Sequence, residues 1–254
     1  MRQYIKTAVV ASAGIAVFSS SALAAYNDQD VLLSFRAAGA ASDFTVDLGQ
    51  ASQFTASSSF NLSTVGYNAA DLVSVFGSLN NVIWSAWAGN SASGGNQGWI
   101  SGATSTPWLD MTATAMRNVD SAINNFAGGN IVAANLFGTS TTEYKYSSAG
   151  TVSFTKYQSS GGTINGTFAS QGSTDVGDGV NFGTTGYLTA ITASPITPKP
   201  PGTLLGTFTF DATTGQGMWN GSSVAAPEPA TYGAISGLGL LALALRRQLM
   251  SKSV

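Results

Sequence analysis

Hydrophobic and polar residues alternate in many segments between residues 30 and 210. A two-residue period predicts β-strands where β-branched and aromatic residues are frequent and where Gly, Asn and Ser bound the segment. The clearest alternations are residues 154–157 (FTKY) and 206–210 (GTFTF). We predict eight strands, the sixth with a turn at Asn165-Gly166 that would split it, at residues 31–37, 43–48, 81–87, 143–146, 151–157, 163–169, 187–193 and 204–210.

Two segments instead have the spacing of amphipathic helices. Asn68 is a suitable N-cap for a helix over residues 69–79, whose apolar residues fall on one face. A second helix is predicted over residues 107–126, with Gly128-Gly129 as its C-cap. Strands on both sides of helical insertions predict a mainly β protein. We expect a single β-sandwich or jelly-roll-like domain with one or two short helices.

The charge of the chain argues against a nucleic-acid partner. Charged residues make up only 9% of the sequence, and all 12 acidic residues lie between Asp28 and Glu228. The same stretch holds five basic residues, which gives it a net charge of −7. Nucleic-acid binding requires clustered Lys and Arg, so we predict no such partner.

The chain contains neither Cys nor His. Their absence excludes a Ser-His-Asp triad, a Cys nucleophile and a conventional zinc site. We therefore expect no cofactor, no metal and no enzymatic activity. One catalytic alternative stays open, because a pair of carboxylates is enough for a glycoside hydrolase, and Asp43 with Asp47 or Asp175 with Asp178 would supply such a pair.

Two further binding hypotheses rest on the central region. Residues 173–179 (STDVGDG) place Asp175 and Asp178 in a Gly-rich loop, which is a candidate oxygen-ligand site for Ca²⁺, although the loop lacks the EF-hand spacing.

Exposed Trp rings stack on sugars. Among the five Trp residues, Trp99 follows a Gly-rich loop and Trp219 lies near the C-terminal segment, so these two are the candidates for carbohydrate binding. Trp84 and Trp87 are three residues apart and should lie on opposite faces of a strand.

The N-terminus has the organisation of a secretory signal peptide. Two basic residues within residues 1–6 precede an apolar run over residues 7–18, and Ala22-Leu23-Ala24 matches the small-x-small cleavage pattern. We predict that residues 1–24 are a signal peptide that is removed between Ala24 and Ala25 by signal peptidase after passage through the Sec translocon.

The C-terminus has the organisation of a membrane tail. Pro227-Glu228-Pro229 is followed by 16 uncharged, largely apolar residues (230–245) and then by Arg246 and Arg247. A helix of this length reaches about 24 Å, which approaches the thickness of the hydrocarbon core when the flanking residues are included. The two arginines should remain cytoplasmic. We predict a transmembrane helix over residues 230–245 with the rest of the chain outside.

This arrangement of Pro-Glu-Pro, apolar helix and Arg-Arg closing the chain resembles the PEP-CTERM sorting signal. The resemblance implies recognition of the tail by an exosortase, a membrane-embedded processing enzyme, and removal of the tail near Pro227–Pro229. It divides the chain into a signal peptide (1–24), a β-rich exported body (25–214), a linker (215–226) and a sorting tail (227–254).

Together these observations predict an exported protein of the cell envelope or extracellular matrix, with a structural or interaction role. It would be anchored transiently in the inner membrane by its C-terminal helix and then placed at the cell surface or outside the cell. The alternatives are a carbohydrate-binding module for exopolysaccharide and a carboxylate-based glycoside hydrolase.

Overall fold

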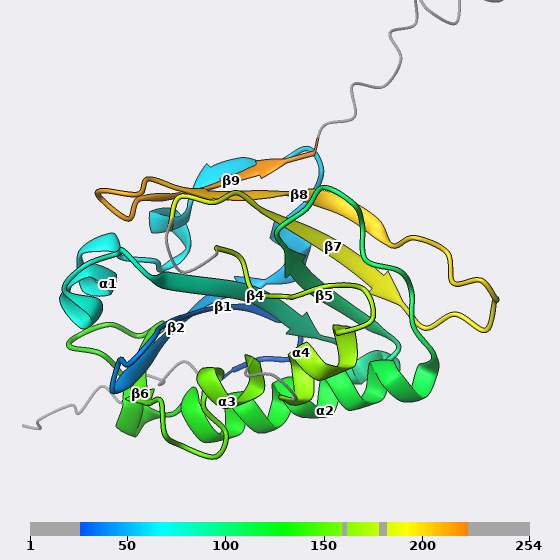
Figure 1. Ribbon diagram of the computed structural model, residues 1–254, viewed down its shortest axis with the longest axis horizontal. Helices are drawn as coiled ribbons and strands as arrows, with labels where there is room; N and C mark the ends of the chain where they lie inside the picture. Colours follow the sequence, from blue (N-terminus) through cyan, green and yellow to red (C-terminus); the bar gives the residue numbers. More distant parts are fainter. Residues whose placement is uncertain (1–25, 159–161, 178–181, 223–254) are drawn as a thin grey trace, which may run out of the picture.

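The computed structural model describes residues 26–158, 162–177 and 182–222, which form a mainly β body. Nine antiparallel strands make one sheet in the order β3-β9-β8-β7-β5-β4-β1-β2-β6 (Figure 1). The strands are β1 Asp30–Ala37, β2 Ser42–Gln50, β3 Ser59–Asn61, β4 Val82–Gly89, β5 Gln97–Gly102, β6 Glu143–Ser147, β7 Gly186–Thr192, β8 Thr203–Phe210 and β9 Gly217–Gly221.

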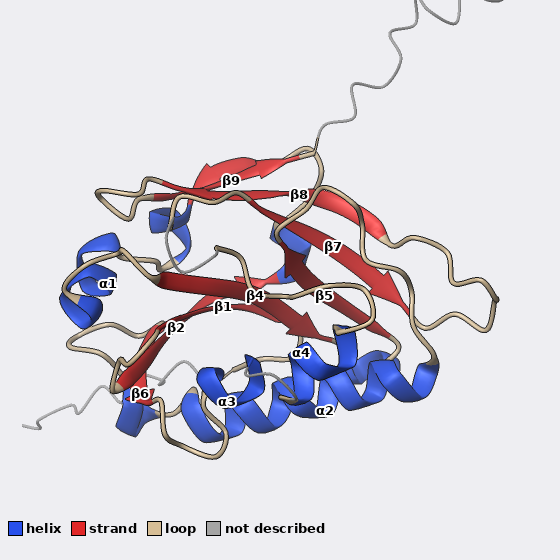
Figure 2. Cartoon of the chain, viewed as in Figure 1, coloured by secondary structure: helices blue, strands red, loops and turns tan. Residues whose placement is uncertain are grey.

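Helices cover one part of this sheet. Figure 2 shows α2, α3 and α4 together on one side, whereas the opposite end of the sheet, with β8 and β9, has no helical layer over it. The described part of the chain has four α-helices: α1 Ala69–Phe76, α2 Ala113–Asn130, α3 Phe154–Gln158 and α4 Thr163–Phe168. Short 3-10 helices occur at Ala51–Gln53, Leu62–Val65, Ser91–Ser93 and Ala133–Asn135.

The sheet is curled, so that strands far apart in its order face each other across an aromatic core. Phe210 on β8 contacts Trp84 on β4 and Phe35 on β1, with ring centroids 4.9 and 5.9 Å apart. A flat sheet would keep β8 and β1 several strand spacings apart. The inward-facing residues of β8 and of β1 and β4 therefore belong to one hydrophobic core inside the curl.

A second core lies between the sheet and the helices. Successive residues of a strand point to opposite faces, so β1 sends Val31, Leu33 and Phe35 into the curl and Leu32 towards the helices. Trp84 and Trp87 divide in the same way: Trp84 belongs to the first core and Trp87 to the second. The prediction that these two indoles lie on opposite faces is confirmed.

Six of the predicted strands are confirmed as β1, β2, β4, β6, β7 and β8. The structure forms a single curled sheet rather than two packed sheets, because β1 pairs with both β2 and β4 and the pairing continues without a break to β3 and β6. The described residues contain four α-helices where we expected one or two. Strands β3, β5 and β9 were not predicted.

The strands predicted at residues 151–157 and 163–169 are wrong. Both segments contain helices, α3 and α4, because their apolar residues also fit a helical period. Phe154 and Tyr157, three residues apart, and Ile164 and Phe168, four apart, are all buried against the second core. Asn165-Gly166, predicted as a hairpin turn, lies inside α4.

Helix α1 begins where the sequence indicates. The Asn68 side chain accepts a hydrogen bond from the main-chain N–H of Ala70 at 3.1 Å, as an N-cap does. Helix α2 is displaced from its predicted range of 107–126: it begins at Ala113, after the N-cap Thr112, and continues through Gly128-Gly129 to Asn130. Residues before Thr112 pair with other extended segments instead.

The predicted linker (215–226) contains the last strand of the sheet. Residues of β9 pair with β8 on one side and with β3 on the other. The predicted body boundary at residue 214 therefore falls before the end of the folded part. Residues 1–25 and 223–254, and with them the predicted signal peptide and transmembrane helix, lie outside the described residues. None of the helices in the described ranges combines the length and the hydropathy that a membrane span requires.

Candidate functional site

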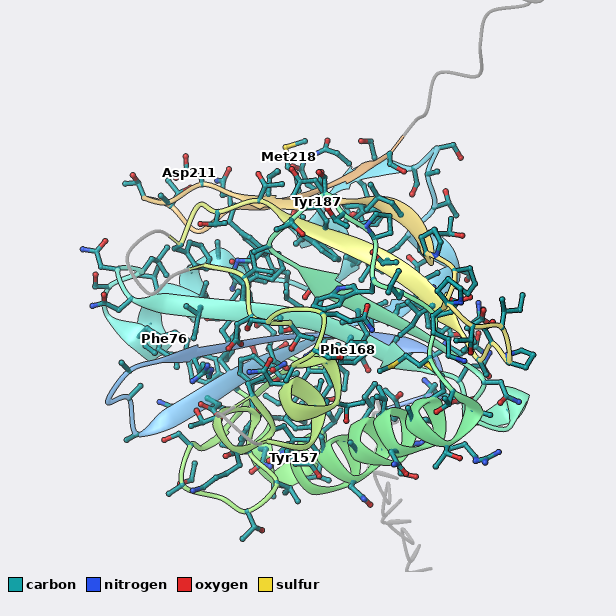
Figure 3. The ribbon with its side chains drawn as sticks, turned by 45° about the vertical axis from the view of Figure 1, so that its right-hand side comes forward. Phe76, Tyr157, Phe168, Tyr187, Asp211 and Met218 are labelled. Carbon is teal, nitrogen blue, oxygen red and sulfur yellow. The ribbon has the colours of Figure 1, made fainter. Side chains whose placement is uncertain are left out.

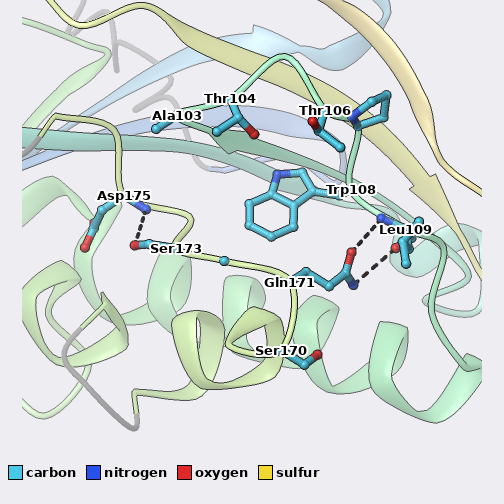
Figure 4. Close-up of a pocket in the computed structure, with 11 residues that line it drawn as sticks. Ala103, Thr104, Thr106, Trp108, Leu109, Ser170, Gln171, Ser173 and Asp175 are labelled. Atoms are coloured by element: carbon cyan, nitrogen blue, oxygen red, sulfur yellow. Dashed lines mark hydrogen bonds between the residues drawn. The ribbon is translucent and has the colours of Figure 1, made fainter.

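A cavity of about 380 Å³ opens beside Trp108, at the border between the helical layer and the uncovered part of the sheet (Figure 4). One wall comes from the segment after β5 and the other from the segment after α4. The lining residues are Ala103, Thr104, Thr106, Pro107, Trp108, Leu109, Ser170, Gln171, Gly172, Ser173 and Asp175.

Trp108 is held rigidly at this cavity. Its indole N–H donates to the carbonyl oxygen of Ser101 at 3.1 Å, and its ring meets Phe168 of α4 edge to face at 5.2 Å. Gly102 and Gly172 lie against the ring: a Cβ on Gly102 would come within 2.9 Å of it. The indole is 8% exposed, so it forms the base of the cavity rather than a protruding platform.

The segment carrying Trp108 is extended, and its two edges have different partners. On one edge the main-chain N–H of Asp110 donates to the carbonyl oxygen of Pro200 at 2.8 Å, and the N–H of Gly202 donates to the carbonyl oxygen of Trp108 at 2.7 Å. On the other edge the Gln171 side chain bonds the main chain of Leu109, accepting from its N–H at 2.6 Å and donating to its carbonyl at 3.5 Å (Figure 4). Gln171 thus joins the two walls of the cavity.

Among the described residues that line this cavity, Asp175 is the only charged one, and its charge is paired with a cation. Asp175 accepts from the Arg36 guanidinium at 2.7 Å. Burial raises the pKa of Asp175, and the ion pair with Arg36 opposes that rise. Asp178, its predicted companion for Ca²⁺ or catalysis, lies outside the described residues. In residues 26–158, 162–177 and 182–222, no three Asp or Glu residues group as a metal site.

An uncharged face of the sheet begins next to the cavity. The strand registers place Gly102, Tyr187, Thr207, Asn220 and Ser59 in one row across β5, β7, β8, β9 and β3. Figure 3 shows Tyr187 and Met218 on the side of the molecule away from Tyr157 and the helices. The outward residues of these strands include no charged side chain; among them are Ser59, Asn61, Tyr187, Thr207, Thr209, Met218 and Asn220.

Side-chain hydrogen bonds fix this face. Ser59 donates to the Asn220 side-chain oxygen at 3.2 Å, and the Asn220 amide donates to the Thr209 hydroxyl at 3.4 Å. Asn220 thereby links β3 to β8 through its own strand β9. The inward neighbours on β8 and β9 are Phe208 and Trp219, which are both fully buried. The outer polar face is therefore backed by a packed aromatic layer.

Trp99 and Trp219, the two indoles predicted to be exposed, are both buried, at 7% and 0% exposure. Trp219 lies in β9 rather than in a linker, and its ring packs between Phe54 and Phe208, with centroids 5.2 and 4.9 Å away. Trp99 points from β5 into the same core. Neither ring is free to stack on a sugar.

The Asp43 and Asp47 carboxylates each have partners of their own. Asp43 is fully buried and accepts from the main-chain N–H and the hydroxyl of Thr155 at 2.8 and 2.7 Å, which ties β2 to α3. Asp47 lies beside Asp30, and burial together with this neighbouring charge raises its pKa to about 7. Asp30 in turn accepts from the Gln50 side chain at 2.5 Å.

Residues 225–248 match the family described as the PEP-CTERM protein-sorting motif. No curated protein and no solved structure matches the chain significantly. The match indicates an exported protein with a C-terminal sorting signal. A PEP-CTERM motif indicates processing by an exosortase. The resemblance predicted for the tail from the sequence is therefore confirmed.

Of the residues that line the cavity, the sequence singled out Asp175 as a candidate but not Trp108 or Gln171. Trp108 falls within the helix predicted over residues 107–126, because Pro107 is acceptable as the first residue of a helix. Gln171 lies in a Gly- and Ser-containing segment whose composition indicates only a loop. The signal that pairs them is tertiary, because 62 residues separate Leu109 from Gln171.

Proposed function

We propose that the mature chain is a non-catalytic interaction protein of the cell envelope or extracellular matrix, exported and then separated from its tail near Pro227–Pro229. The observation that carries the proposal is the position of the sorting motif relative to the fold. Strand β9 ends at Gly221, and the motif begins at residue 225.

Two hydrogen bonds hold Ser222, the last described residue before the motif, against β8. The Ser222 N–H donates to the Leu205 carbonyl at 2.8 Å, and its hydroxyl donates to the Leu204 carbonyl at 2.9 Å. Every strand of the sheet lies before residue 222. Removal of the chain from residue 227 onward would therefore take away no residue of the described body.

The composition of the body is typical of an exported β protein, because Gly, Ser, Thr and Asn replace charged residues as its solvating groups. It contains no Cys and few charges, and its packing relies on aromatic cores rather than on ion pairs. The described residues include ten acidic and five basic side chains, which gives a net charge of −5. Such a body stays soluble through its Ser, Thr and Asn surface and its net charge.

The test replaces Pro227, Glu228 and Pro229 by alanine in the native host and follows the protein in membrane, surface and medium fractions. We expect the variant to accumulate in the membrane fraction, whereas the wild-type protein leaves it. A matched control replaces Ser251, Ser253 and Val254 beyond the arginines by alanine and should be processed normally. Equal processing of the triple Pro-Glu-Pro variant and the wild type would contradict the proposal.

A further inference from the structure

We propose that the cavity at Trp108 and the uncharged sheet row that adjoins it form one continuous site for a neutral polysaccharide chain. This inference rests on the proposed extracellular role and specifies the partner. It differs from the carbohydrate hypothesis drawn from the sequence, which placed the ligand on Trp99 and Trp219, because both of those rings are buried.

The two parts adjoin at Gly102, which is itself buried beneath the Trp108 ring. This residue pairs with Tyr187 across β5 and β7, and its missing side chain makes room for the Trp108 ring at the base of the cavity. From Tyr187 the row continues through Thr207 and Asn220 to Ser59. Five neighbouring strands span about 19 Å, the length of several sugar units rather than of one small ligand.

The chemistry of the lining fits an uncharged, hydroxylated ligand. The cavity offers a covered aromatic base with apolar Pro107 and Leu109 and a rim of hydroxyls from Thr104, Thr106 and Ser173. Sugars present both apolar C–H faces and hydroxyl groups, which such a mixture of surfaces recognises. Tyr187 adds a half-buried phenol ring at the junction with the sheet row.

Charge distinguishes the class of polysaccharide. The carboxyl group of Asp175 is paired with Arg36, and the outward row has no basic side chain to bind a uronate or a sulfate. The net charge of −5 on the described residues repels polyanions at low salt. A neutral chain meets no such barrier.

The site is also prepared before binding. Ser59, Asn220 and Thr209 are linked by side-chain hydrogen bonds, and Gln171 fixes Leu109 between the cavity walls. Groups that are already ordered lose little conformational entropy when a ligand binds. A long chain can therefore bind through many weak contacts without a deep pocket.

The experiment uses protein purified from the native host and native gels containing dextran, laminarin or galactomannan as neutral probes and alginate as an acidic probe. Two exposed or half-exposed positions are changed: Thr207→Lys places a charged side chain in the row, and Thr104→Arg blocks the cavity mouth. The matched control, Thr114→Lys, adds the same charge on the exposed surface of α2. Unfolding temperatures within about 2 °C of wild type establish that each variant is folded.

We expect at least one neutral glycan to retard the wild type and Thr114→Lys equally, and each site variant to bind at least 10-fold more weakly. The inference is overturned if no neutral probe retards the protein, if alginate alone does, or if both site variants bind normally. Loss in only one site variant overturns the claim of a continuous site. Because purified protein is measured, failure here leaves the sorting result intact, and failure of sorting leaves this measurement intact.

Discussion

Replacing Trp219 by alanine tests whether β9 belongs to the folded body. The indole is fully buried, packs between Phe54 and Phe208, and donates its N–H to the Ser58 hydroxyl at 3.0 Å. Truncation of a buried Trp costs about 3–5 kcal/mol, and loss of the hydrogen bond leaves the Ser58 hydroxyl with one partner fewer. We expect Trp219→Ala to lower the free energy of unfolding by about 4 kcal/mol.

The assay is urea unfolding followed by tyrosine and tryptophan fluorescence, with circular dichroism as a second probe. For a body of this size the expected loss corresponds to a fall in unfolding temperature of roughly 10 °C. Met218→Ala is the matched control, because Met218 is the adjacent residue on the outer face and is 43% exposed. It should change the free energy of unfolding by less than about 0.5 kcal/mol. A loss below about 1 kcal/mol for Trp219→Ala would refute the assignment of β9 to the core.

Three further predictions concern charges and caps. Burial, aided by Asp30 for Asp47 and by Asp71 for Glu143, raises the folded-state pKa of Asp47 to about 7 and of Glu143 to about 8. Both pKa values exceed those of the unfolded chain, which are about 4. Between about pH 4 and about pH 8 the folded protein therefore binds more protons than the unfolded chain, and its free energy of unfolding should fall as the pH rises through this range. Urea midpoints measured across this pH range should decline. The double variant Asp47→Asn with Glu143→Gln should show a smaller decline. An equal decline in this variant and the wild type would contradict the assignment of the pH dependence to Asp47 and Glu143. Arg36→Met leaves the carboxyl of Asp175 buried without its cation and should lower the free energy of urea unfolding by about 2 kcal/mol. Adding Asp175→Asn should restore part of this loss. If the losses of the two single variants simply add in the double variant, the two side chains are not coupled as a pair. Thr112→Ala removes the cap on Ala115 N–H and should cost about 1 kcal/mol, whereas no change would place the start of α2 elsewhere.

The sequence was most informative where local pattern and tertiary packing agree. Strand β2 alternates regularly because Phe44, Val46 and Leu48 point into the curl, and Asn68 caps α1 through a contact two residues away. The PEP-CTERM motif was recognisable for a similar reason: its parts follow each other within 24 residues. These features require no knowledge of distant contacts.

The errors arose where tertiary contacts decided the outcome. Residues 154–157 alternate like a strand, yet α3 forms because Phe154 and Tyr157 both stack on Trp87 from one face of a helix. Strand β9 is short and contains Gly and Asn, which locally indicate a linker, but pairing with β8 and β3 on both sides makes it a strand. The curl itself depends on contacts such as Trp84 with Phe210, which no local pattern encodes.

The central claim is that this chain is an exported body whose fold ends just before a removable sorting tail. The most direct test is the intact mass of the protein recovered separately from the membranes, surface matrix and culture medium of its native host. We predict a species that begins at Ala25 and ends near Pro227–Pro229, found outside the inner membrane. A species that retains residues 230–254 and remains in the membrane would contradict the account.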